Sequence, residues 1–104
     1  MNERVTFVTC KDLRQARAIA RALVEEKLAA CVNVLPGATS VYRWEGRVEE
    51  AKEVLLLIKS TAARAKALEA RVKALHSYEL PEVLSVPVAG GSAAYLRWLR
   101  ENAR

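Results

Sequence analysis

The hydrophobic positions in the first third of the chain change period in a way that predicts a strand, a helix and a second strand. Residues 4–10 are rich in β-branched and aromatic side chains, a composition typical of a buried strand. A helix is predicted next, with Asp12, or alternatively Thr9, as its N-cap. Its apolar face has three- and four-residue spacing and consists of Leu13, Ala16, Ala20, Leu23, Val24 and Leu28. A short apolar run over 29–35 then predicts a strand beside the first, with the helix as connector.

The chain after the Pro36-Gly37 break predicts a hairpin with one unusually long arm. Residues 40–44 alternate as in a strand, and Glu45-Gly46 supplies a tight turn. Residues 47–59 then continue without Gly or Pro, whereas strands usually have about five or six residues. Either a bulge interrupts this strand near 49–52, or the hairpin projects beyond its own domain. A projecting hairpin has exposed edges, which a second copy of the chain would cover, so we expect a homo-oligomer.

The second half of the chain predicts a helix, a strand and a last helix. Residues 62–76 carry an inner apolar stripe and predict a helix, and 77–81 predict a loop. Residues 82–88 predict a fourth strand at a sheet edge, because Pro87 cannot donate to a strand ladder. A last helix follows the Gly90-Gly91 break, with apolar residues Ala94, Tyr95, Trp98 and Leu99. The order predicts an α+β fold, a ferredoxin-like βαββαβ sandwich with a C-terminal helix and an extended β-hairpin, in a single domain over residues 1–104.

Composition narrows the class of protein further. The chain is 52% hydrophobic and 28% charged, which is typical of a globular protein. The net charge is +5, and the basic residues are spread along the chain, several of them on two predicted helices, whereas a nucleic-acid site favours a clustered basic stripe with exposed aromatics. The longest apolar run, 54–58, is too short for a membrane span, and the first residues lack a signal-peptide core. We expect a cytoplasmic protein with free thiols and with neither a membrane nor a nucleic-acid partner.

The sequence lacks the common catalytic and closed metal-site motifs, so we do not expect an enzyme. It contains no phosphate-binding glycine loop and no Cys-x-x-Cys pair, and its single histidine has no adjacent nucleophile. Cys10 ends the first strand just before a helix N-terminus, where the pKa of a thiol is lowered. With His76 it would form a soft ligand pair suited to copper or zinc. The alternatives are an ordinary strand end for Cys10 and a helix-dipole partner for His76, and Cys31 is expected to be a buried core thiol.

The aromatic residues allow two interpretations. The first is core and interface packing, because aromatics are enriched at protein interfaces; it concerns Tyr42, Trp44, Tyr78, Tyr95 and Trp98. The second is a ligand cleft that uses some of these rings, with Lys59 and Glu82 as its polar anchors.

Three blocks of the sequence, in this order and spacing, resemble the CutA divalent-cation-tolerance family. They are LVEEKLAACVNVLPGATSVYRWEGRVEEAKEVLLLIK, LHSYELPEVLSVPV and YLRWL. The resemblance implies a ferredoxin-like domain that forms tight trimers, similar to the PII signalling proteins, and a link to copper and other divalent cations. Cys10 and His76 match positions implicated in copper binding in relatives. This chain departs from the family at Leu75 and Ser77, where relatives often have a second histidine and a proline.

These observations lead to one main expectation and two alternatives. The main one is a cytoplasmic homotrimer that binds copper or another divalent cation without catalysis, through Cys10, His76 and Glu82. The first alternative is a PII-like signalling trimer that holds a small anionic ligand in inter-subunit clefts at Lys59, Tyr78 and Trp44. The second, a nucleic-acid binder on a ferredoxin-like sheet, has the least support, because it needs exposed aromatics on the sheet face.

Overall fold

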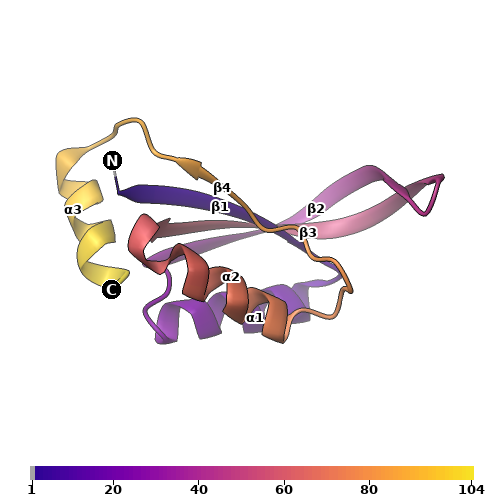
Figure 1. Cartoon of the computed structure of the whole chain (residues 1–104), viewed down its shortest axis with the longest axis horizontal. Coiled ribbons are helices and arrows are strands. Elements are labelled where there is room, and N and C mark those ends of the chain that lie inside the picture. Colours follow the sequence, from indigo (N-terminus) through magenta and orange to yellow (C-terminus); the bar gives the residue numbers. More distant parts are fainter. Residues whose placement is uncertain (1) are drawn as a thin grey trace.

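The computed structural model describes residues 2–104 and shows a four-stranded antiparallel sheet in the order β2-β3-β1-β4. Helices α1 and α2 cover one face of this sheet, and α3 packs at one of its ends (Figure 1). The predicted ferredoxin-like α+β fold is therefore confirmed. The elements are β1 (Glu3–Cys10), α1 (Leu13–Glu25), β2 (Cys31–Trp44), β3 (Arg47–Thr61), the 3₁₀ turn η1 (Ala62–Arg64), α2 (Ala65–Leu75), β4 (Leu84–Pro87) and α3 (Ala93–Asn102).

The prediction that the second strand lies beside the first is wrong. Strand β3 lies between them and pairs with β1 from Glu3–Thr61 to Cys10–Val54. The connection from β1 through α1 to β2 leaves a gap of one strand between β1 and β2. Strand β3, the second arm of the hairpin, occupies this gap. This split βαβ arrangement makes β2 and β4 the two edges of the sheet.

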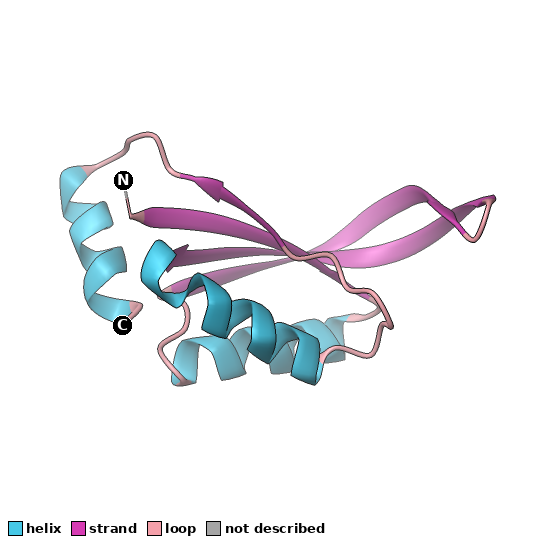
Figure 2. Ribbon diagram, viewed as in Figure 1, coloured by secondary structure: helices cyan, strands magenta, loops and turns pink. Residues whose placement is uncertain are grey.

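The hairpin of β2 and β3 projects beyond the other strands (Figure 2). The predicted break at Pro36-Gly37 is wrong, because β2 continues through it with a register shift between Leu35 and Ala38. Gly37 has a φ of +90°, which glycine adopts without strain, so the irregularity is a bulge on an edge strand. Strand β3 shows no such shift near 49–52. The chain measures 44 × 25 × 23 Å, and its radius of gyration of 14.0 Å exceeds the ~13 Å of a compact chain this long.

The face of the sheet under the helices forms the main core. Asp12 caps α1 as predicted, since its Oδ1 accepts a hydrogen bond from the Gln15 backbone N–H at 2.8 Å. Alternate strand residues point toward the helices and are buried with the inner stripes of α1 and α2. The largest fully buried members are Val8, Cys10, Ile19, Leu23, Leu56, Ile58, Leu68 and Val72.

The opposite face of the sheet, here called the open face, is also apolar but lies away from α1 and α2. Its apolar members are Val5, Phe7, Leu35, Leu55, Leu57, Leu84 and Val86, and Cys31, Asn33 and Lys59 lie on the same face. Leu84 and Val86 on the edge strand β4 are 61% and 44% exposed. Exposed apolar side chains gathered on one face of a small domain are typical of an interaction surface.

Helix α3 closes one end of the sheet. Ser92 caps it as predicted, and Leu99 packs on Ala30. Arg100 forms an ion pair with the buried Glu3 at 2.6 Å, and its hydrogen bond is the main cause that lowers the pKa of Glu3. No helix in residues 2–104 has the length and apolar character needed to cross a membrane.

Candidate functional site

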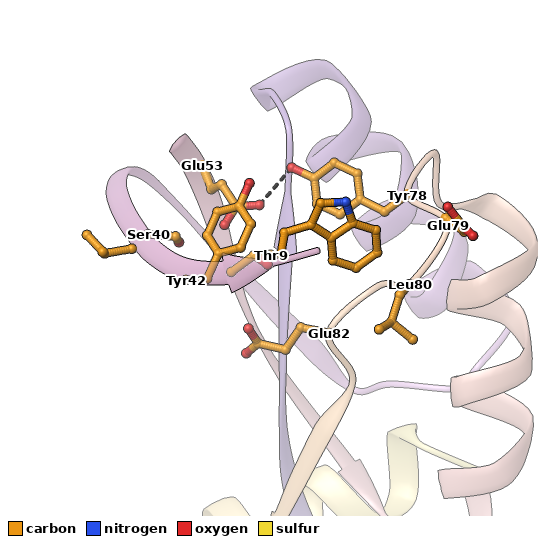
Figure 3. A pocket seen from close by; sticks show the side chains of 10 residues that line it. Thr9, Ser40, Tyr42, Glu53, Tyr78, Glu79, Leu80 and Glu82 are labelled. Carbon is orange, nitrogen blue, oxygen red and sulfur yellow. Dashed lines mark hydrogen bonds between the residues drawn. The ribbon is translucent and has the colours of Figure 1, made fainter. Parts of the chain in front are cut away.

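A groove of about 550 Å³ lies between the hairpin, the end of β1 and the loop after α2. Figure 3 shows its side chains converging from these three segments. Because strands β1 and β3 alternate, Thr9 and Glu53 point to the same side of the sheet as Leu55 and the open face. The lining consists of Thr9, Ser40, Val41, Tyr42, Trp44, Glu53, Tyr78, Glu79, Leu80 and Glu82.

His76 attaches the groove-forming loop to the end of β1. It ends α2 with an extended backbone, and its ring is buried. Nδ1 accepts a hydrogen bond from the Tyr78 N–H at 3.1 Å, so the proton lies on Nε2, which donates to the Thr9 carbonyl at 2.7 Å. Both ring nitrogens are therefore used, and the ring also packs on Tyr78 with centroids 4.6 Å apart.

Tyr78 and Glu53 form a part-buried polar contact in the groove. The Tyr78 hydroxyl donates to Glu53 Oε2 at 2.7 Å, and only 9% of Glu53 is exposed. Burial, followed by this hydrogen bond, raises the pKa of Tyr78. Tyr78 thus remains a neutral donor and holds the Glu53 carboxylate in place.

Glu82 is the second important carboxylate of the groove. Burial and then the nearby Glu53 charge raise the pKa of Glu82, as expected for two acids that share a site. Within residues 2–104, the ion pairs involve other acids and leave the three glutamates of the groove without a basic partner; the paired acids are Glu3, Glu25, Glu26 and Glu69. The groove is therefore acidic although the chain as a whole is basic.

Cys10 does not have the reactive environment that its position in the sequence predicts. Its side chain lies on the helix-covered face and is fully buried in the main core. Burial is the main cause that raises the pKa of this thiol to about 11, and the charges of Glu53 and Asp12 raise it further. The expectation of a lowered pKa is wrong, because strand alternation directs the thiol into the core rather than toward solvent.

The predicted metal ligands Cys10, His76 and Glu82 all belong to this end of the sheet, but they have different surroundings. Cys10 is a buried thiol, His76 has both nitrogens in hydrogen bonds, and Glu82 lines the groove. Among residues 2–104, no three His, Cys, Asp or Glu side chains are grouped so as to hold a metal ion. The set stays a prediction, and it requires His76 to release a hydrogen bond.

The predicted anion cleft is divided by the structure. Trp44 and Tyr78 line the groove, but Lys59 does not. Lys59 is six residues from Glu53 along β3, a separation of about 20 Å. The cleft was predicted between subunits, where Lys59 would come from another copy, so it stays a prediction.

The predicted interface aromatics lie at two separate places, both partly exposed. Tyr42 and Trp44 belong to the hairpin and are 43% and 39% exposed. Tyr95 and Trp98 lie on α3 with ring centroids 5.4 Å apart. Cys31 is half-buried rather than a core thiol, and it contributes to the raised pKa of Tyr95, of which burial is the main cause.

Glu53 is the important groove residue that sequence reasoning missed. It directly precedes the apolar run 54–58 and resembles an ordinary solvated residue at the start of a buried segment. The available signal was period-two alternation, which puts Glu53 on one side of β3 with Leu55 and Leu57. A charged residue on this otherwise apolar side of β3, close to the end of β1, indicates a polar site.

Comparison with known proteins identifies the family. The family model described as CutA1 divalent ion tolerance protein matches residues 4–102. The divalent-cation tolerance protein CutA of Thermus thermophilus is 54% identical over 96% of this chain and 97% of its own length. Protein CutA of Homo sapiens is 47% identical over 91% of this chain, which spans about half (53%) of the human protein.

Solved structures agree with this match. The crystal structure of CutA from Xylella fastidiosa superposes with a TM-score of 0.97 at 45% identity and covers 100% of both chains. The divalent cation tolerance protein structure from Thermus thermophilus gives a TM-score of 0.96 at 53% identity, covering 98% of this chain and 99% of the other. This chain therefore belongs to the CutA1 divalent ion tolerance protein family.

Proposed function

We propose that this protein supports divalent-cation tolerance by binding the cation directly and without catalysis in the acidic groove. The observation that supports this is the pair Glu53 and Glu82, which face one groove with no basic partner in residues 2–104. Two nearby carboxylates repel each other, and a divalent cation between them reverses that repulsion. A bound cation would therefore be attracted by both groups.

The donor set suits a weak and exchangeable site. Carboxylate oxygens dominate, and the hydroxyls of Ser40, Tyr78 and Thr9 are available nearby. Copper(II) and zinc accept oxygen ligands as well as imidazole, so either cation fits the proposal. His76 becomes an additional ligand only if it gives up its hydrogen bond to Thr9 or the one from Tyr78. Cys10 becomes a ligand only if the main core opens.

Calorimetric titration with Cu(II) and with Zn(II) tests this proposal. Glu53→Gln and Glu82→Gln should each weaken binding about tenfold or more, because each removes one charged ligand and one source of attraction. Glu25→Gln, which changes an exposed acid of α1, is the matched control and should bind as wild type. Unchanged affinity in both groove variants, with loss in Cys10→Ala plus His76→Ala, would favour the soft ligand pair instead.

We also propose that the protein is a homotrimer whose copies cover the open face and the projecting hairpin. The apolar residues of the open face and the exposed hairpin aromatics support this, since burying them gains hydrophobic free energy. Light scattering should give three times the 11.5 kDa chain mass. A monomer at micromolar concentration would contradict the proposal.

The cytoplasm is the compartment that we propose for this chain. Cys10 and Cys31 are both free thiols, which suits a reducing environment. Expression with a fluorescent tag, followed by cell fractionation, tests this assignment.

A further inference from the structure

We propose that a basic pocket at the end of the sheet away from the hairpin binds a small oxyanion of the phosphate class. Its volume is about 290 Å³, and it lies between the residue before β1, the end of β3, the turn η1 and the C-terminal end of α3. Figure 1 shows these segments together at the end of the molecule that carries α3. Thr61 is eight residues from Glu53 along β3, about 26 Å, so the basic pocket is separate from the acidic groove.

Arginines provide all the charge that lines the basic pocket. Arg64 comes from η1, and Arg100 and Arg104 come from α3 and the residues after it. No Asp or Glu of residues 2–104 lines the pocket. Arg100 pairs with the buried Glu3, but no ion pair in this part of the chain involves Arg64 or Arg104. Two positive charges therefore lack a counter-charge, and a bound dianion would neutralise both.

The guanidinium of Arg64 provides an independent argument. Its Nε is buried and has no hydrogen-bond acceptor among the residues that the structure describes. Buried polar groups are nearly always hydrogen-bonded, because an unpaired donor loses its contact with water without a replacement. The side chain lines the pocket, so a modest rotation would let Nε and a terminal nitrogen donate together to one oxyanion. The planar guanidinium fork matches the geometry of phosphate oxygens, which favours this class of ligand.

Neutral donors complete the lining of the basic pocket. The Asn2 amide and the Thr61 hydroxyl line the same space, and both groups can donate to an oxyanion. The Thr61 hydroxyl donates to the Ala103 carbonyl at 3.4 Å, longer than the usual ~2.5–3.0 Å, so little is lost if it turns toward a ligand. No side chain caps the start of α2, and the positive end of its dipole adds to the attraction for an anion.

The basic pocket lies outside the surfaces that the proposed assembly covers. The copies are proposed to cover the open face and the hairpin, whereas Arg64 leads into α2 on the opposite side of the sheet (Figure 1). At this end α3 itself covers Glu3 and Thr61, which are 1% and 7% exposed. Arg100 follows Trp98 by two positions, about 200° around the helix. Packing of the exposed Trp98 against another copy would therefore leave Arg100 on the other side of α3.

Calorimetric titration of the assembled protein with inorganic phosphate, in a low-salt buffer without other polyvalent anions, tests the site. We expect saturable binding of one phosphate per chain, with acetate at least about tenfold weaker because it carries a single charge. The absence of saturable phosphate binding at millimolar concentration would overturn the proposal, and it is also the result expected if another copy closes the pocket. Equal affinities for phosphate and acetate would overturn it as well.

Variants locate the binding. Arg64→Gln should weaken phosphate at least about tenfold, because it removes one charge and the unpaired donor. Arg104→Gln, on the other side of the pocket, should weaken it in the same direction. Arg17→Gln is the matched control and should stay within about twofold of wild type, since Arg17 is exposed on α1 and lies outside the pocket. Wild-type affinity in both pocket variants, or equal weakening in the control, would overturn the assignment.

Separate metal titrations distinguish this proposal from the proposed function. Arg64→Gln should leave Zn(II) affinity within about twofold of wild type, and Glu53→Gln should do the same for phosphate, because the two sites lie about 26 Å apart. Light scattering checks that each variant keeps the wild-type mass. Loss of phosphate binding in Glu53→Gln would place the anion elsewhere and overturn the proposal. Phosphate binding without any metal binding would contradict the proposed function and leave the basic pocket standing.

Discussion

The two faces of the sheet are built from alternate residues of the same strands, yet they differ in what covers them. Leu56 is fully buried under α1 and α2, whereas its neighbour Leu57 points to the open face and is only half-buried. Both residues are leucines in one apolar run. The difference shows that hydrophobicity identifies a strand, while the position of the helices decides which of its faces is completed within the chain.

The chemically important groups divide in the same way. Cys10 belongs to the covered face, where burial keeps it a neutral thiol. The side chain of Glu53 points to the same side of the sheet as the open face, and it lines the groove. The covered face therefore provides stability, and the other side of the sheet holds the groups that are available for binding.

The largest expected effect follows from removing a side chain of the covered face. Leu56→Ala should lower the free energy of unfolding by about 2–5 kcal/mol, because it leaves a cavity in the main core. Urea denaturation followed by circular dichroism measures this loss. Leu57→Ala is the matched control: its cost should be smaller and should grow on dilution, since it acts through assembly. If the two variants lost the same free energy of unfolding, and neither loss depended on protein concentration, the distinction between the faces would be contradicted.

A charge on the open face should separate the copies. Leu57→Asp places a carboxylate where we propose that a second copy packs, and an unpaired buried charge is strongly unfavourable at an interface. Light scattering should show the mass falling toward that of one chain, with an unchanged circular dichroism spectrum. Leu57→Met should keep the wild-type mass, and a full-sized assembly in Leu57→Asp would disprove this role for the open face.

Loss of the hairpin aromatics should have an intermediate effect. Tyr42→Ala combined with Trp44→Ala should weaken the proposed trimer more than it changes secondary structure, because both rings lie on the projecting arm and are partly exposed. The mass measured at low micromolar concentration should fall while the far-ultraviolet spectrum stays the same. A mass identical to wild type would assign these rings to the groove alone.

The smallest expected stability change concerns Glu82. Its pKa is raised in the folded chain, so protonation favours the folded state and ionisation at neutral pH costs some stability. Glu82→Gln should therefore leave the free energy of unfolding at pH 7 unchanged or slightly higher, within about 0.5 kcal/mol.

The same raised pKa predicts how cation binding depends on pH. Because the cation binds the ionised carboxylate, affinity should decline as pH falls through the raised pKa of Glu82, at higher pH than for an ordinary glutamate. Titrations between pH 7 and pH 5 measure the decline, and Glu82→Gln should flatten it. An affinity that rises as pH falls would contradict the carboxylate site.

Much of the fold could be predicted from period and capping residues, but strand neighbours could not. Asp12 and the change of period defined α1, and the length of β3 indicated the projecting hairpin. Pro36-Gly37 was misleading because an edge strand tolerates a residue without a backbone donor at a bulge. Whether β2 lies beside β1 depends on how far the crossover reaches, which local periodicity does not encode.

The groove was predictable only in part, because it joins segments that are far apart in the sequence. Trp44, Tyr78 and Glu82 were recognised as candidate ligand contacts, and all of them line it. Lys59 does not line the groove of its own chain, and the cleft predicted between subunits stays a prediction. Glu53 was missed because its importance depends on the approach of Tyr78, a tertiary contact across 25 positions.

Anomalous diffraction from crystals grown with Zn(II) or Cu(II) tests the central claim most directly. The proposed function predicts one anomalous peak per chain inside the groove, within bonding distance of Glu53 and Glu82 and with the hydrogen bonds of His76 intact. A peak between Cys10 and His76, or no peak in the groove at saturating metal, would contradict it.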